Sequence, residues 1–273
     1  MKKRLSNTWL IIRFGIEKYL TKNFKMFVPS SAGSSILLGK HTAISINLIF
    51  PLLEKLMQVL SIKTNIYSAV SFCKTNKKIE ESVKLKKLFD FYGSDKSTMH
   101  NYHLVYASLF QKKKDSVQKV LEIGLGTNNT SILSNMGPMG KPGASVRAFR
   151  DYFTKAKIFG ADIDSEILFS EKRIKTYKVD QCSIDSMENL FKKKIGKNFD
   201  LIIDDGLHAP YTNLNFILAC LDKLKKNGWM IIEDIPFKTK PIWCIICFIL
   251  NVKEKCFLIK TKNCYVFCLN KKT

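Results

Sequence analysis

Two apolar runs in the second half of the chain end on adjacent carboxylates. "LIIDDG" (201–206) ends on acids that include Asp205, and "WMIIED" (229–234) ends on Glu233 and Asp234. If the runs are neighbouring parallel strands, about 4.8 Å apart, the three acids meet at one edge of a sheet. Crowded carboxylates repel one another unless a cation holds them, and an all-oxygen cluster suits Mg²⁺ or a similar divalent cation. The spacing therefore predicts a metal site.

A histidine lies beside the first pair of acids. His208 follows Asp205 after a glycine turn, so its imidazole can lean over the same site. A neutral imidazole is suited to act as a general base near pH 7. The alternative is that each acid caps the helix after its strand and the histidine is incidental. Either pair alone favours capping, whereas two pairs with a histidine favour the metal site.

A second group of candidate residues lies at the ends of three earlier apolar runs. "VLEIGLG" (120–126) ends in glycines, which allow a tight turn and the close approach of a ligand. The next run ends on Asp162, whose carboxylate can accept hydrogen bonds from both hydroxyls of a ribose. The third run ends on Asp180 and Gln181, where the edge of an adenine base would lie. Because the third glycine of the dinucleotide pattern is absent, the turn favours S-adenosylmethionine over NAD. The candidate cofactor residues are Glu122, Gly124, Gly126, Asp162, Asp180 and Gln181.

Apolar strands alternate with amphipathic helices after residue 118, which predicts an α/β fold with a doubly wound, mostly parallel sheet. In such a sheet, ligands bind outside the carboxyl ends of the strands, where both groups of candidate residues lie. Residues 253–261 and 263–271 are expected to form a C-terminal antiparallel hairpin. The five expected strands lie within 119–126, 156–164, 175–183, 199–206 and 228–235, and helices are expected within 77–93, 98–110, 186–195 and 212–228.

The first part of the chain has a less regular pattern. Residues 1–80 are expected to form a basic and apolar, helical region, with helices around 7–24 and 44–60, before a catalytic domain at 81–273. The apolar stretches at 43–53 and 241–250 are too short to span a bilayer, so both are expected to be buried.

Charge and cysteine content limit the classes of partner. The net charge is +22, but the lysines are spread along the chain without a basic stripe interleaved with aromatics, which disfavours specific nucleic-acid recognition. The sequence leaves open whether the basic region 1–80 contacts an anionic membrane. It also leaves open whether the protein forms a homo-oligomer. Cys244 and Cys247 form a C-x-x-C pair without a second pair to complete a zinc site. Reduced thiols and a cytoplasmic location are expected, since no secretory signal is recognisable.

Six motifs together resemble a known family. The chain is similar, from about Phe91 to Pro236, to the macrolide-sugar O-methyltransferases of the mycinamicin and tylosin pathways. This resemblance implies dependence on S-adenosylmethionine and magnesium, with a Rossmann-like fold. Ser97 and Leu207 depart from the family pattern, and Leu207 makes the acceptor side more apolar. The motifs are "FYGSDKSTMHNY", "VLEIGLGT", "PGASVRAFRDYF", "FGADID", "IIDDGLH" and "GWMIIEDI". The resemblance implies that Asp205, Glu233 and Asp234 hold the metal and that His208 takes a proton from a sugar hydroxyl.

The expected activity is methyl transfer to a hydroxyl of a sugar, either on a small molecule or on a glycan. A catechol-like diol would satisfy the same chemistry. Methylation of nucleobase nitrogens is disfavoured, because "DDGLH" follows the fourth strand where an Asn/Asp-Pro-Pro-aromatic motif would be needed. Two alternatives remain. One is a hydroxylase-like enzyme of the same fold that uses another metal, and the other is a non-catalytic basic protein that docks on an acidic surface.

Overall fold

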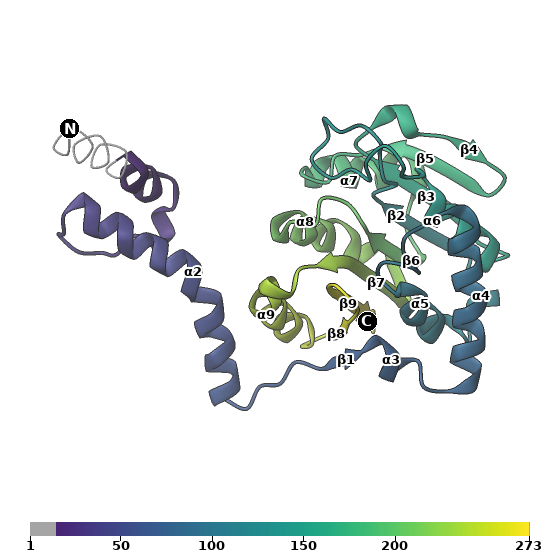
Figure 1. The fold of residues 1–273 in the computed structure, drawn as a ribbon, viewed down its shortest axis with the longest axis horizontal. Helices are drawn as coiled ribbons and strands as arrows, with labels where there is room; N and C mark the ends of the chain where they lie inside the picture. Colours follow the sequence, from purple (N-terminus) through teal and green to yellow (C-terminus); the bar gives the residue numbers. More distant parts are fainter. Residues whose placement is uncertain (1–14, 273) are drawn as a thin grey trace. The chain divides into compact units, whose positions relative to one another are not determined.

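The computed structural model describes residues 15–272 and divides into two compact units, Met1–Lys63 and Thr64–Thr273 (Figure 1). In the first unit residues 15–23 are helical, followed by η1 (Lys25–Phe27) and α2 (Ser35–Val59). Part of the helix expected around 7–24 therefore lies outside the described residues. The side chain of Ser34 caps α2 by accepting a hydrogen bond from the Leu37 N–H.

Helix α2 is longer than the sequence pattern predicts. It begins at Ser35 rather than near residue 44 and continues through Pro51 to Val59. It has 25 residues and contains an 18-residue window with a mean hydropathy of 1.5, so it is long and apolar enough to cross a membrane by length and composition. The sequence had predicted apolar segments too short to span a bilayer, and the length of α2 corrects that prediction. The sequence pattern was misleading because the proline and the charges of Glu54 and Lys55 resemble a helix end, although the backbone continues as a helix.

The second unit begins earlier than the expected division near residue 80. Strand β1 (Ile66–Ser68) pairs in parallel with β8 (Lys255–Lys260), with Ile66 opposite Leu258. Helix α3 (Ala69–Phe72) follows β1 directly. These residues therefore extend one edge of the main sheet.

The second unit contains one mixed sheet with the strand order β1-β8-β9-β7-β6-β2-β3-β5-β4. The predicted fold class is confirmed: all five expected strands form, and β6 and β7 are parallel neighbours. The C-terminal hairpin is antiparallel and adds β9 to β7. The remaining strands are β2 (Lys119–Ile123), β3 (Lys157–Asp162), β4 (Ser170–Glu171), β5 (Ile174–Lys178), β6 (Phe199–Asp204), β7 (Leu224–Ile235) and β9 (Tyr265–Asn270).

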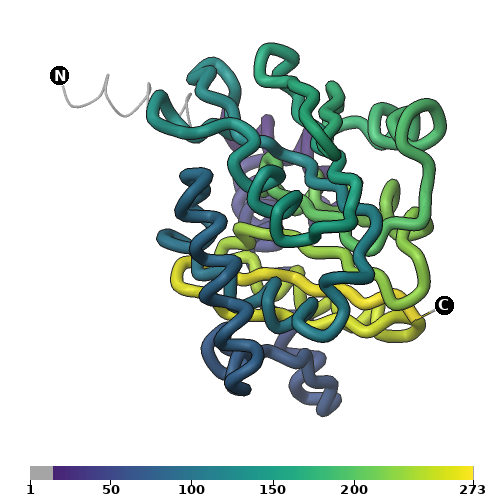
Figure 2. The backbone as a smooth tube through the Cα atoms, turned by 90° about the vertical axis from the view of Figure 1, so that its right-hand side faces the viewer, coloured from purple at the N-terminus to yellow at the C-terminus, as the bar shows by residue number. Residues whose placement is uncertain are grey.

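Helices cover both faces of this sheet. Figure 1 shows α4, α5 and α6 on one side and α7, α8 and α9 on the other. Figure 2 is turned so that the first side faces the viewer, with the blue-to-teal helices in front of the sheet. These helices are α4 (Asn76–Tyr92), α5 (Tyr102–Phe110), α6 (Ala144–Tyr152), α7 (Ile184–Leu190), α8 (Pro210–Cys220) and α9 (Lys240–Leu250). Single turns of 3-10 helix lie at η2 (Lys114–Ser116), η3 (Ser165–Ile167), η5 (Leu221–Lys223) and η6 (Phe237–Thr239), and η4 (Phe191–Ile195) is a short π-helix after α7.

The strands separate two apolar cores. Val120 of β2 packs with the helices of one face, and the next residue, Leu121, packs with those of the other. Because successive side chains of a strand point to opposite faces, a strand covered on both sides must be apolar throughout. The predicted helix within 212–228 is only partly correct. Helix α8 ends at Cys220, and the residues from Leu224 onward already belong to β7.

Candidate functional site

A cavity of about 560 Å³ lies in the second unit, at the carboxyl ends of the central parallel strands. It is lined by both groups of candidate residues, so the structure brings the predicted cofactor half and the predicted acid half into one space. Among the predicted residues, Glu122 alone does not line it. Those that do are Gly124, Gly126, Asp162, Asp180, Gln181, Asp205, His208, Glu233 and Asp234.

The glycine turn after β2 packs directly against the acid half. Gly124 has φ +96°, and a Cβ placed there would lie 2.0 Å from the carbonyl oxygen of Asp205. Gly126 has φ +75°, and its Cβ would lie 1.9 Å from the sulfur of Met136. Both the backbone conformation and the lack of space exclude larger residues. The turn therefore holds the β2 and β6 loops in close contact.

The carboxylate of Asp162, at the end of β3, fixes the same turn. Its Oδ2 accepts a hydrogen bond from the Leu125 N–H at 2.7 Å, and its Oδ1 accepts one from the Asp164 N–H at 3.0 Å. Each carboxylate oxygen has a second lone pair, so Asp162 can still accept ligand hydroxyls on the cavity side. The position of Asp162 agrees with the expected contact to the ribose of the cofactor, and that contact stays a prediction.

The side-chain amide of Gln181 links the segments that follow β5 and β6 through hydrogen bonds. Gln181 Nε2 donates to Asp204 Oδ1 at 2.6 Å, and Gln181 Oε1 accepts from the Leu207 N–H at 3.0 Å. Asp204 also accepts from Asn213 Nδ2 at 2.9 Å, and burial raises the pKa of this carboxyl to about 6. Of the two aspartates in "DDG", Asp204 therefore organises the loop, and Asp205 is left to face the cavity.

A lysine that the sequence analysis did not single out lies among the acids. Lys96 is buried, with its Nζ 2.6 Å from Asp205 Oδ2 and 3.2 Å from Glu122 Oε1, and it also binds Glu233 Oε2. Burial alone would lower the pKa of Lys96, but the charges of Asp205, Glu233 and Glu122 raise it well above its usual value. A protein cation thus neutralises these carboxylates.

The two glutamates beside Lys96 are buried. Glu122 accepts a hydrogen bond from Ser145 Oγ at 2.7 Å, and burial raises the pKa of its carboxyl to about 7. Glu233 Oε1 accepts one from the Tyr106 hydroxyl at 2.6 Å, and burial raises the pKa of Glu233 well above its usual value. Glu122 thus lies beneath the cavity and supports Lys96, where the sequence had predicted cofactor contact.

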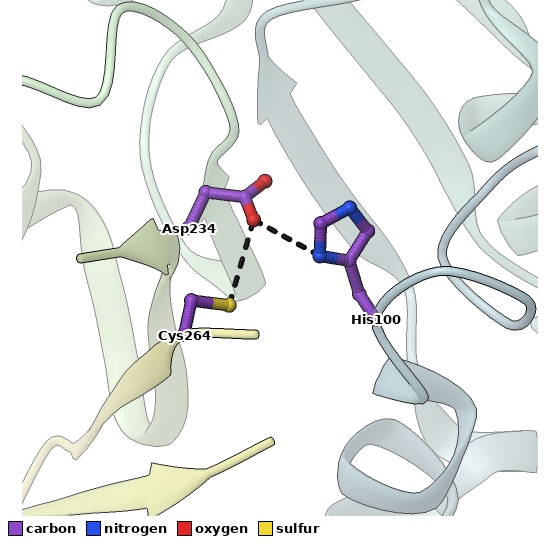
Figure 3. A group of neighbouring side chains, drawn as sticks. All are labelled: His100, Asp234 and Cys264. Carbon is purple, nitrogen blue, oxygen red and sulfur yellow. Dashed lines mark hydrogen bonds and ion pairs between the residues drawn. The ribbon is translucent and has the colours of Figure 1, made fainter. Parts of the chain in front are cut away.

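The second acid of β7 faces a different set of side chains. Asp234 Oδ1 accepts a hydrogen bond from the Tyr102 hydroxyl at 2.7 Å and lies 3.2 Å from His100 Nδ1. Cys264 Sγ donates to the same oxygen at 3.5 Å, and Figure 3 shows the carboxylate between the histidine and the cysteine. Asp234 is therefore oriented by residues of α5, by the loop before it and by the β8–β9 turn.

Within residues 15–272, three overlapping groups of side chains could hold a metal ion. Ligand atoms of Asp205, His208 and Asp234 lie within 4.8 Å of one another at the cavity. This set of two carboxylates and one imidazole suits a divalent cation. Glu233 belongs to a group that surrounds Lys96, so it reaches a metal at the cavity only if the lysine moves. The other two groups are Glu122, Asp205 and Glu233, and His100, Asp234 and Cys264.

Most of the residues that sequence reasoning missed come from one segment, residues 96–106. Lys96 supplies the cation, Tyr102 and Tyr106 supply hydroxyl donors, and His100 places an imidazole beside Asp234. Both tyrosines are buried on α5, within the helix expected at 98–110, and their hydroxyls also bind the acids. The polar stretch "SDKSTMHNY" immediately before an amphipathic helix was the available signal.

No family model matches the chain. The chain is 28% identical over 144 residues to the 8-demethyl-8-alpha-L-rhamnosyl tetracenomycin-C 2'-O-methyltransferase of Streptomyces olivaceus, covering 53% of this chain and 35% of that protein. It is 26% identical over 137 residues to the mycinamicin VI 2''-O-methyltransferase of Micromonospora griseorubida, covering 50% and 32%. The chain thus spans about a third of the length of the curated relatives that it matches.

A solved structure has the same fold. The MycE methyltransferase from the mycinamycin biosynthetic pathway, in complex with Mg and SAH, superimposes with a TM-score of 0.56 at 22% identity, covering 69% of this chain and 55% of MycE. Its fold agrees with the mixed sheet described above. Together with the sequence matches, this shows that the chain is a distant homologue of the S-adenosylmethionine-dependent O-methyltransferases that act on sugars in macrolide and related pathways, with their Rossmann-like fold.

Proposed function

We propose that this protein transfers a methyl group from S-adenosylmethionine to a hydroxyl of a sugar or a similar vicinal diol. The observation that carries the proposal is that the glycine turn, Asp162, Asp205, His208 and Asp234 all line the same cavity. Its two halves suit a nucleoside and a hydroxyl acceptor. The relatives' names give sugar hydroxyls as their acceptors, which supports the same class here.

The cofactor half would bind S-adenosylmethionine through the turn after β2 and the ends of β3 and β5. Gly124 and Gly126 allow the tight turn that borders this half, and Asp162 and Asp180 offer carboxylate oxygens to the hydroxyls of the ligand. This placement would direct the sulfonium methyl toward the acid half of the same cavity. Holding the two reactants in that geometry supplies much of the rate acceleration.

The acid half would bind and deprotonate the acceptor. His208 lines the cavity, and its Nδ1 is buried with no hydrogen-bond partner among the described residues. The imidazole would take the hydroxyl proton while the oxygen–methyl bond forms and the methyl–sulfur bond breaks, leaving S-adenosylhomocysteine. Leu207 gives the acceptor side an apolar contact.

A divalent cation fits the carboxylates that face this side. Asp205 and Asp234 would hold it, with Glu233 joining if Lys96 moves, and the ion would lower the pKa of a bound hydroxyl. MycE, whose fold this chain shares, was solved with Mg, which supports the same kind of ion here.

The test is transfer of labelled methyl from S-adenosylmethionine to a panel of rhamnosyl and other deoxysugar acceptors. The wild-type protein should label an acceptor, and His208→Ala should lower the rate by about 10²–10⁴-fold while binding S-adenosylhomocysteine normally. His41→Ala on α2 is the matched control and should keep full activity. Equal rates for His208→Ala and the wild type would contradict the role given to the imidazole.

A further inference from the structure

Helix α2 exposes an unusual amount of apolar surface. Only Gly39, Thr42 and Met57 are buried among the residues of α2. In the apolar 18-residue window of the helix, 11% of the residues are buried. Contiguous apolar surface of this kind marks a contact with a partner or with lipid. The exposed large apolar residues are Leu37, Ile44, Leu48, Ile49, Leu52, Leu53, Leu56 and Val59.

Four polar residues of α2 form one narrow stripe, and Ser35, His41, Thr42, Ser45 and Lys55 lie outside it. Lys40, Asn47 and Glu54 follow one another at seven-residue intervals, which places them close together on the helix surface. Gln58, four residues after Glu54, continues the stripe. The rest of the circumference is mostly apolar, so a helix lying flat on a bilayer would keep the stripe in water and bury the wide apolar side.

Two hydroxyl groups outside that stripe already have partners within the helix. Thr42 Oγ1 donates to the Leu38 carbonyl at 2.7 Å, and Ser45 Oγ donates to the His41 carbonyl at 2.9 Å. Hydroxyls bonded to the preceding turn in this way enter an apolar medium without an unpaired donor. On the stripe itself, the amide of Asn47 donates to the Ala43 carbonyl at 2.8 Å.

The charges around α2 indicate what kind of surface it meets. Residues 1–63 hold ten lysines and arginines against two glutamates. Exposed lysines stand before the helix, at Lys22 and Lys25, and at and beyond its end, at Lys55 and Lys63. Basic residues that flank an apolar helix are attracted to anionic lipid headgroups. This complementarity favours an anionic membrane over a second copy of the same basic chain.

The charge positions also favour a flat helix over a spanning one. Residues 41–53 contain no Asp, Glu, Lys or Arg and cover roughly 20 Å as a helix, less than the roughly 30 Å of a hydrocarbon core. A spanning helix would therefore bring Lys40 or Glu54 into the core. It would also place the basic segments before and after α2 on opposite leaflets, whereas a flat helix leaves both at one anionic surface.

We propose that α2 lies in the interface of an anionic membrane and holds the methyltransferase unit, Thr64–Thr273, at that surface. The first test is co-sedimentation of the full chain with vesicles of equal phosphatidylglycerol and phosphatidylcholine. Binding should persist when salt rises to about 1 M, where the Debye length falls to about 3 Å, because the apolar side is inserted. Binding that disappears at that salt, or a soluble dimer without vesicle binding, would overturn the proposal.

Two variants of one helix separate insertion from charge. Leu52→Glu puts a carboxylate on the apolar side, and Asn47→Glu puts the same charge on the polar stripe. The first should lower vesicle partitioning by about tenfold or more, and the second by less than about threefold. Equal losses would contradict the proposed orientation. Thermal unfolding of both variants should match the wild type, because both side chains are exposed.

The flat orientation has its own readout. A protease site added before residue 1 and another placed after Lys63 should both be cut by protease outside sealed vesicles. Protection of one site alone would show that the helix spans the bilayer and would overturn the flat arrangement.

Discussion

The ammonium group of Lys96 lies 2.6 Å from the Asp205 carboxylate, at the point where acids from β2, β7 and the loop after β6 converge. The acids that the sequence assigned to a metal are thus already partly neutralised by a residue 109 positions before Asp205. Buried carboxylates repel unless a positive charge is present, and Lys96 supplies that charge in the protein itself. A divalent cation at Asp205 and Asp234 would therefore share the Asp205 carboxylate with a lysine.

Replacement of Lys96 by methionine should strongly destabilise the protein. Lys96→Met leaves Glu122, Asp205 and Glu233 together without their counter-charge, and loss of one partner of a buried pair costs about 3–5 kcal/mol. Urea unfolding measures this loss, and added Mg²⁺ should recover part of it. The control is Lys84→Met, because the Lys84 side chain is exposed and its partner Glu81 keeps a second ion pair with Lys114. A Lys96→Met variant as stable as that control would contradict the neutralising role.

Two glycine variants separate close packing from backbone strain. Gly124 and Gly137 both have positive φ, but a Cβ at Gly124 would meet the Asp205 carbonyl, whereas one at Gly137 would meet no atom within 4 Å. Gly137→Ala should cost only the conformational penalty, about 1 kcal/mol. Gly124→Ala should cost clearly more and weaken cofactor binding, because the β6 loop must move. Thermal unfolding and ligand titration compare the two, and equal effects would show that the contact is unimportant.

Stability should fall in mild acid because of His103. Burial, aided by the charge of Lys86, lowers the pKa of His103 to about 4. Between about pH 6.5 and pH 4 the unfolded chain binds the proton that the folded protein excludes, so the free energy of unfolding decreases as pH falls. Allowing for partial solvent screening, the effect is up to about 2 kcal/mol.

The measurement is urea unfolding at pH 7 and pH 4.5 for the wild type and His103→Gln. The variant should lose less stability on acidification than the wild type, and His41→Gln on α2 should behave as the wild type does. If all three proteins showed the same acid sensitivity, His103 would not be the responsible group.

The central sheet could be predicted because its physical pattern is local. The strands β2, β3, β6 and β7 are buried on both faces, which requires the continuous apolar runs seen in the sequence. Strand β1 could not be found in this way. Its three residues are all exposed, and it is defined by backbone pairing with β8, far away in the sequence.

The part of the site that lies at the ends of strands could be predicted from the sequence. Parallel strands bring their ends together, so Asp205, Glu233 and Asp234 were expected to meet beside His208. Ligand atoms of Asp205, His208 and Asp234 lie close together, whereas Glu233 forms a separate group with Glu122 and Asp205. The position of Lys96 depends on how the loop before α5 packs against the strand ends. No periodic pattern in the sequence encodes that packing. The length of α2 was missed for a different reason, because Pro51 lies inside a helix that continues past it.

Calorimetric titration of S-adenosylhomocysteine and Mg²⁺ tests most directly the claim that one cavity joins a cofactor half to a metal half. The wild type should bind both ligands. Asp162→Asn should weaken S-adenosylhomocysteine by about 10- to 100-fold and spare Mg²⁺, because a carboxylate acceptor is lost at the turn. Asp234→Asn should do the reverse. Failure of the wild type to bind S-adenosylhomocysteine, or equal loss of both ligands in both variants, would contradict the account.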